Sequence, residues 1–205
     1  MKIDVKICGI TSREDAFLAT SAGATHLGFV IGVPESKRNM NREDATDIVQ
    51  YIKSEYSGII CVGVFVDKIF EDVVNIVRDC KLDVVQLHGD ESTEFCQKLR
   101  NFVKVYKAII IKSKKDLSLI KKYEGVVDRI LLDAGHGSGE QIDFDLLEGV
   151  EVDILAGGIS PDNVLEIVGN VRPKMIDVSG GVELFPGRKS KIFIQKLFTN
   201  IINCN

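Results

Sequence analysis

Short apolar runs rich in β-branched residues alternate with charged amphipathic segments along the chain, and this alternation constrains the fold more than any other feature. The strand-plus-helix unit occurs eight times, and no predicted strand directly follows another. Strands that are separated by helices connect in parallel, because a tight hairpin cannot join them. The pattern therefore predicts a parallel sheet covered by helices.

The predicted strands are Ile3–Cys8, His26–Ile31, Ile59–Val66, Asp83–His88, Val103–Ile111, Arg129–Ala134, Asp153–Ala156 and Met175–Ser179. The predicted helices cover residues 12–23, 41–53, 69–80, 91–100, 114–123, 143–147, 161–168 and 189–202. Eight units fit one closed (β/α)8 barrel, a TIM barrel, formed by a single domain over residues 1–205. An open doubly wound sheet is the alternative, but it normally carries Gly-x-Gly-x-x-Gly after its first strand, and Cys8–Thr11 does not match.

Composition argues against several classes of partner. A net charge of -4 and the absence of tryptophan give no reason to expect nucleic acid or a membrane surface. No apolar stretch reaches membrane-spanning length and no leader segment precedes the first strand, so we expect a cytoplasmic protein. The five cysteines contain no Cys-x-x-Cys pair and the three histidines are scattered, so we expect neither a disulfide framework nor a metal site.

Active sites of (β/α)8 barrels form where the strands end at their carboxyl side. Polar residues or glycines stand at most of these ends: Cys8, Asp67, Gln86, His88, Lys107, Asp133, Gly157–Gly158 and Ser179–Gly181. Arg38 lies in the loop after the second predicted strand. These residues are therefore the candidates for a site.

Two adjacent strand ends predict a phosphate site. Gly157 and Gly158 separate a strand from a helix start, and Ser179 and Gly180 end the last strand. Glycines let the backbone approach a ligand, and backbone N–H groups at helix starts bind anions. The alternative is that these glycines only make tight turns, but two such turns on adjacent strands favour phosphate.

Cys8 and Asp133 form a second group, because a thiol and a carboxyl at one barrel mouth can act as base and acid. A cysteine with a reference pKa of about 8.5 can be tuned toward neutral pH. Each residue also has an ordinary interpretation. Cys8 could be an inert buried thiol, and Asp133 could cap a helix or order a loop.

Strand alternation also predicts a buried ion pair. If Cys8 points inward, so does Lys6, and if Ser179 points to the mouth, so does Asp177. The first and last strands are neighbours in a closed barrel, and an unpaired buried charge is costly. We therefore expect a pair between Lys6 and Asp177. The alternative is that Lys6 extends out of the bottom of the barrel.

Each remaining candidate can be either a site residue or a residue with an ordinary structural role. Arg38 can bind a carboxylate or phosphate through two hydrogen bonds, or be a solvated loop charge. His88 shares the parity of Gln86 and can belong to the site or to the core. The loop 135–139 can be a lid or a long turn, and Asp67 can be a mouth residue or a cap.

Six motifs in order resemble phosphoribosylanthranilate isomerases, barrel enzymes of tryptophan biosynthesis. They are KICGIT (6–11), VGVFVD (62–67), QLHGDE (86–91), LLD (131–133), AGGI (156–159) with Asn163-Val164, and DVSGGVE (177–183). Each motif is short, but the ordered set runs nearly from end to end and is specific. Three positions depart from the family pattern: Lys37 stands where proline is usual, Gly180 where a second serine is usual, and Ser190 where the family often has aspartate.

The resemblance implies a cofactor-free Amadori rearrangement of a small phosphorylated substrate, N-(5-phosphoribosyl)anthranilate, by a monomer or homodimer. It makes Asp133 the general acid and Cys8 the general base. It assigns Arg38 to the anionic ring, with Gln86, His88 and Asp177 as further substrate-binding residues. The turns at Gly157-Gly158 and Ser179-Gly180 match the family's phosphate site.

Other phosphate-binding barrels are the competing hypotheses. An indole-glycerol-phosphate synthase would show catalytic lysines and a glutamate at strand ends, and a ribulose-phosphate epimerase would show metal-binding histidines. A non-catalytic barrel that binds a phosphorylated ligand is the alternative from a different class. The presence of both Cys8 and Asp133 favours an enzyme over a binding module.

Overall fold

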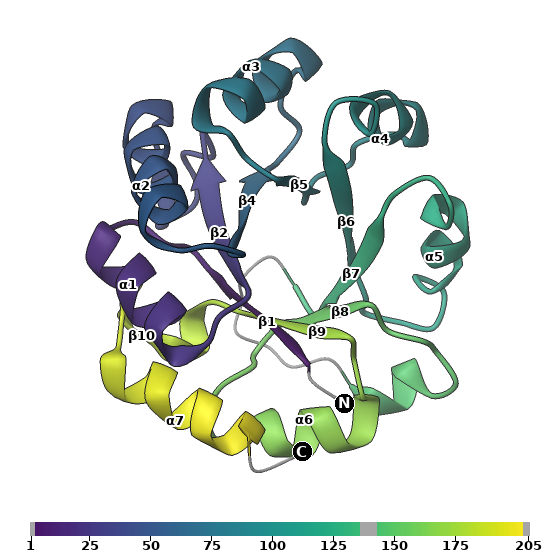
Figure 1. Cartoon of the computed structure of the whole chain (residues 1–205). Helices are drawn as coiled ribbons and strands as arrows, with labels where there is room; N and C mark the ends of the chain where they lie inside the picture. The colour runs from purple at the N-terminus through teal and green to yellow at the C-terminus, as the bar shows by residue number, and fades with distance from the viewer. Residues whose placement is uncertain (1–2, 136–142, 203–205) are drawn as a thin grey trace.

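Eight parallel strands close into a barrel in the computed structural model, which describes residues 3–135 and 143–202 (Figure 1). In ring order the strands are β1 (Asp4–Cys8), β2 (His26–Ile31), β4 (Ile60–Phe65), β5 (Val84–Leu87), β6 (Lys104–Ile110), β7 (Arg129–Asp133), β8 (Ile154–Ala156) and β9 (Met175–Val178). Strand β1 pairs in parallel with both β9 and β2, and these pairings close the ring. The predicted (β/α)8 barrel is confirmed, and the open-sheet alternative is wrong.

Helices surround the barrel on its outer side, as Figure 1 shows in a view close to the barrel axis. They are α1 (Arg13–Ala22), α2 (Arg42–Glu55), α3 (Phe70–Cys80), α4 (Thr93–Leu99), α5 (Ser118–Tyr123), α6 (Val164–Val171) and α7 (Lys191–Ile202), with a 3-10 turn η1 (Phe144–Leu147) after β7. The Ser12 side chain accepts a hydrogen bond from the Asp15 N–H and caps α1 as predicted. None of the described helices is long and apolar enough to cross a membrane.

Two apolar layers fill the molecule. Outward-facing strand residues such as Leu27 and Phe65 pack with the helices in the larger cluster. The alternate residues point inward and fill the lower barrel, among them Val62, Tyr106 and Leu131. The polar strand ends therefore rest on a packed apolar floor, which is the usual arrangement in this fold.

Three short strands were not predicted. Strand β3 (Asn39–Met40) pairs with β2 at Val30 and Ile31, beyond the point at which β1 ends. Strands β10 (Glu183–Phe185) and β11 (Arg188–Lys189) form an antiparallel hairpin between β9 and α7. The expectation that no strand directly follows another is therefore wrong here, because ladders of two or three residues are too short to produce a periodic pattern.

Two predicted helices begin three or four residues later than expected. Helix α6 starts at Val164 because Asn163 forms a turn before it, accepting from the Ser160 N–H and donating to the Gly158 carbonyl. Helix α5 starts at Ser118, after a turn held by the Asp116 carboxylate, which accepts from the Ser113 N–H. Polar side chains that bond to nearby backbone favour turns over helix starts at these places.

The turns after β8 and β9 touch through Gly181, where an added Cβ would lie 2.0 Å from the Ile159 carbonyl oxygen. We expect Gly181→Ala to lower the free energy of unfolding by about 1–3 kcal/mol, because backbone must move to make room. Gly169→Ala is the control: this residue lies within α6 with open space around it, and the change should stabilise by about 0.5–1 kcal/mol. Urea unfolding measures the free energy of unfolding of both variants. Equal changes in the two variants would contradict the close contact between Gly181 and Ile159.

Candidate functional site

The carboxyl ends of the barrel strands bring most of the predicted site residues to one mouth. Cys8 and Asp133 are the last residues of β1 and β7, and β9 and β8 separate these strands in the ring. Both side chains are largely buried, at 9% and 5% exposure. A thiol and a carboxyl therefore stand across the mouth from each other above the apolar floor.

The predicted ion pair between Lys6 and Asp177 is confirmed. The two residues are partners in the β1–β9 register, and Lys6 Nζ donates to Asp177 Oδ2 over 2.7 Å. Lys6 is fully buried, which alone would lower its pKa, but Asp177 and Cys8 together outweigh burial and the pKa is raised. The ammonium therefore stays charged inside the barrel.

Gly28 on β2 gives the thiol and the ammonium a common space. A Cβ added at Gly28 would lie 2.7 Å from Cys8 Sγ and 2.9 Å from Lys6 Nζ. Burial raises the pKa of Cys8, and Lys6 partly opposes that rise. Gly28 was not singled out in the sequence, because a glycine inside an apolar run does not reveal what faces it.

Asp133 is oriented by a row of polar groups from β5. Asp133 Oδ2 lies 3.3 Å from His88 Nε2, and His88 Nδ1 lies 3.2 Å from Gln86 Nε2. The Gly135 N–H donates to Asp133 Oδ1 over 3.1 Å. His88 thus contacts the candidate acid. Gln86 has the same inward parity, and its Oε1 is buried without a hydrogen-bond partner among the described residues.

The two glycine turns form one surface at the mouth. Gly157 and Gly158 have φ angles of 94° and 59°, which glycine adopts without strain. A Cβ at Gly157 would lie 2.9 Å from Asp133 Oδ1, so this turn lies beside the candidate acid. A Cβ at Gly9 would lie 3.2 Å from Ser179 Oγ, so the second turn lies beside the end of β1.

Arg38 reaches the mouth from the loop before β3. Its Nε and Nη2 donate to the two oxygens of Glu183, over 2.8 Å and 2.6 Å. Lys189 Nζ donates to the same Glu183 carboxylate over 2.8 Å. The sequence did not single out Glu183 and Lys189 as site residues, although two charged residues close to a glycine turn are a weak signal for one.

Lys107 does not point into the mouth, and Asp67, whose interpretation as a mouth residue or a cap was open, orders a loop. Lys107 points out of the barrel, between the inward-facing Tyr106 and Ala108, and forms a buried ion pair with Glu91 over 3.2 Å. Asp67 orders a loop, since its Oδ1 accepts from the Asp90 N–H over 2.6 Å. Of the loop 135–139, residues 136–139 lie outside the described residues.

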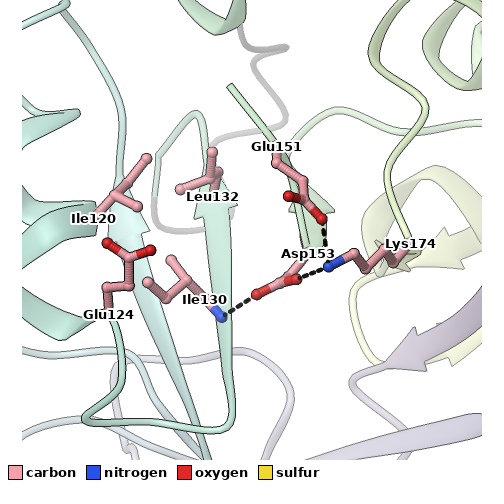
Figure 2. Close-up of a pocket in the computed structure, with 7 residues that line it drawn as sticks. All are labelled: Ile120, Glu124, Ile130, Leu132, Glu151, Asp153 and Lys174. Atoms are coloured by element: carbon pink, nitrogen blue, oxygen red, sulfur yellow. Dashed lines mark hydrogen bonds and ion pairs between the residues drawn. The ribbon is translucent and has the colours of Figure 1, made fainter. Parts of the chain in front are cut away.

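A hollow of about 250 Å³ lies on the outside of the barrel, near the amino ends of β7 and β8 (Figure 2). Lys174 there bridges Glu151 and Asp153, over 2.7 Å and 2.9 Å. This hollow contains none of the mouth residues.

In the described part of the chain, no three His, Cys, Asp or Glu side chains are grouped so that they could hold a metal ion.

The buried pair yields a direct test. Lys6→Met should lower the free energy of unfolding by about 3–5 kcal/mol, because Asp177 would remain as a buried charge without its partner. The exposed bridge of Lys174 is the control, and Lys174→Met should change stability little. Thermal and urea unfolding measure both, and a Lys6→Met protein as stable as the parent would show that the pair is not needed.

Comparison with known proteins identifies the family. The family model for N-(5'phosphoribosyl)anthranilate (PRA) isomerase matches residues 5–200. The N-(5'-phosphoribosyl)anthranilate isomerase of Geobacter sulfurreducens is 43% identical, over 91% of this chain and 92% of its own. A monomeric form of the dimeric Thermotoga maritima isomerase is 35% identical with a TM-score of 0.87, over 98% of this chain and 99% of that chain.

Another solved isomerase was crystallised in complex with reduced 1-(o-carboxyphenylamino)-1-deoxyribulose 5-phosphate. It is 34% identical to this chain with a TM-score of 0.88, over 98% of this chain and 100% of that chain. These matches agree with the motifs and the barrel. The chain belongs to the family of N-(5'-phosphoribosyl)anthranilate isomerases, enzymes of tryptophan biosynthesis.

Proposed function

We propose that this chain rearranges N-(5'-phosphoribosyl)anthranilate to 1-(2-carboxyphenylamino)-1-deoxyribulose 5-phosphate, with Asp133 as general acid and Cys8 as general base. One observation carries the assignment: a thiol and a carboxyl stand at the ends of two strands at the same mouth, each with its own polar neighbours. The family's isomerase activity supports the choice of substrate.

The acid step opens the sugar ring. Protonated Asp133 gives its proton to the ribose ring oxygen while the bond from that oxygen to C1′ breaks, and the nitrogen lone pair forms the Schiff base. His88 and the Gly135 N–H hold the carboxyl group in place through the contacts described above. A carboxyl group fixed in this way is aimed at one acceptor atom.

The base step moves the proton at C2′. The Cys8 thiolate removes that proton, and the electron pair forms the C1′–C2′ double bond as the Schiff base nitrogen regains its lone pair. The resulting enolamine takes a proton at C1′ and loses the proton of its 2′-hydroxyl group, which gives the ketone, so the reaction is an isomerisation with no net change in atoms. The Lys6 ammonium stabilises the thiolate, because it opposes the rise in the pKa of Cys8 more than Lys189, the other cation that acts on the sulfur.

The substrate has two anionic ends and a polyhydroxylated sugar, and the rest of the mouth has groups that can bind each of them. The glycine turns at Gly157-Gly158 and Ser179-Gly180 would receive the phosphate, and Arg38 would receive the ring carboxylate. Asp177 Oδ1 and Gln86 Oε1 are buried acceptors without a hydrogen-bond partner among the described residues. Sugar hydroxyl groups can donate to both, which relieves the cost of leaving them unpaired.

Turnover of the purified protein is the first test. The protein should consume freshly made substrate with loss of its fluorescence, and Cys8→Ala or Asp133→Asn should lower kcat/KM by about 10²–10⁴-fold while the fold is retained. Cys61→Ala is the control, because this thiol is also buried but packs with the helices instead of facing the mouth. Binding without turnover would support a ligand-binding barrel, and an active Cys8→Ala enzyme would remove the base assignment.

The pH profile tests the state of Cys8. Burial raises its pKa, so the thiolate fraction at neutral pH is small and should increase as the pH rises. We therefore expect the rate of Cys8 alkylation by iodoacetamide to increase with pH above neutrality until the thiol is fully ionised. Peptide mass spectrometry measures this rate at Cys8, and a rate that does not change with pH would contradict the prediction.

A further inference from the structure

The hairpin formed by β10 and β11 brings two buried charges to the mouth. Glu183 and Lys189 are 9% and 2% exposed. Lys189 Nζ donates to the Cys8 carbonyl over 2.5 Å, to the Ser179 carbonyl over 3.2 Å and to Glu183 Oε1 over 2.8 Å. One ammonium thus ties the end of β1, the end of β9 and the hairpin together.

Glu183 transmits this anchoring to Arg38. The carboxylate binds the guanidinium through two parallel hydrogen bonds, a geometry that fixes orientation as well as distance. Arg38 is separated from Glu183 by 145 positions in the sequence, so the hairpin and the loop after β2 meet only in the folded barrel. The Gly187 N–H also donates to Glu183 Oε1, over 3.3 Å.

Two glycines shape the space that Arg38 occupies. Gly9 has a φ of 76°, and a Cβ there would lie 2.4 Å from Arg38 Cδ. A Cβ at Gly180 would lie 3.4 Å from Arg38 Nη2. The arginine therefore lies over the end of β1 and against the turn that follows β9, between the candidate base and the candidate phosphate site.

The charges of this cluster suit an anionic ligand. Burial alone would raise the pKa of Glu183, but Arg38 and Lys189 lower it overall, so the carboxylate is ionised. Two cations around one carboxylate leave a net positive charge. Glu183 uses Nε and Nη2 of Arg38, so the Nη1 side of the guanidinium is the side not committed to this pair.

We infer that Glu183, anchored by Lys189, is a positioning residue that holds the Arg38 guanidinium in one orientation to receive the carboxylate on the aromatic ring of the substrate. This inference rests on the proposed function. It differs from a purely structural role in one respect. Loss of Glu183 should weaken binding only of ligands that carry the ring carboxylate, and only while Arg38 is present.

Glu183→Gln is the sharpest variant. Glutamine keeps an oxygen for Lys189 and Arg38 Nε, but it places an N–H group opposite Arg38 Nη2 and removes one of the two bonds. The probes are reduced 1-(2-carboxyphenylamino)-1-deoxyribulose 5-phosphate and the same compound without the carboxyl group. Calorimetry should show about tenfold weaker binding of the first probe and less than about twofold change for the second.

A double-mutant cycle separates positioning from stability. In an Arg38→Met background, Glu183→Gln should change affinity for the carboxylated probe less than about twofold, because its effect passes through Arg38. Glu14→Gln is the matched control, since it removes the 2.6 Å ion pair between Glu14 and Arg188 on the outer side of the same hairpin. That variant should leave both affinities unchanged.

The outcomes distinguish this inference from the proposed function. Equal weakening of both probes, an unchanged affinity in Glu183→Gln, or the same loss with and without Arg38 would each overturn the positioning role. Failure of the parent protein to turn over substrate would overturn the proposed function, while the affinities would still decide the role of Glu183. In an active enzyme, Glu183→Gln should raise KM more than it lowers kcat, because the carboxylate is bound equally in the ground state and the transition state.

Discussion

The buried ion pair between Lys6 and Asp177 joins the first and last strands of the barrel and determines what its mouth can contain. Both residues point into the barrel at the same level of the β1–β9 ladder. A charged pair in that position costs desolvation energy, which the close contact between Lys6 Nζ and Asp177 Oδ2 offsets in part. It also sets the electrostatics of Cys8, because the ammonium shares with the sulfur the space left by Gly28. Barrel closure and the proposed base chemistry thus depend on one interaction.

Buried lysines have a repeated role at the rim. Lys6 joins β1 to β9, Lys107 joins the end of β5 to β6, and Lys189 joins β1, β9 and the hairpin. Each ammonium is paired with a carboxylate, and Lys107 and Lys189 also donate to backbone carbonyls that the strand ends leave open. Strand ends and loops fixed in this way hold the candidate base and the Arg38 cation in place, as catalysis by positioned groups requires.

The proposed chemistry asks for an ionised thiol and a protonated carboxyl at the two sides of one mouth, and the two groups have different surroundings. Cys8 lies beside a permanent cation, whereas Asp133 lies beside His88 and a backbone N–H. The glycine turn at Gly157 passes directly over Asp133, so the candidate acid and the candidate phosphate site share one wall. Substrate bound by its phosphate would therefore be brought to the acid by the same loop.

Sequence alone determined the barrel and much of its mouth, because periodicity and strand parity are local properties. They predict that Cys8 and Asp133 end strands and that Lys6 pairs with Asp177. Strand parity did not predict that the Lys107 side chain points out of the barrel, because a strand that is apolar on both faces shows no alternation. Only the tertiary structure decided that the hairpin places Glu183 against Arg38. Its two- and three-residue strands carry no periodic signal, and a contact across 145 positions depends on how the closed ring places its loops.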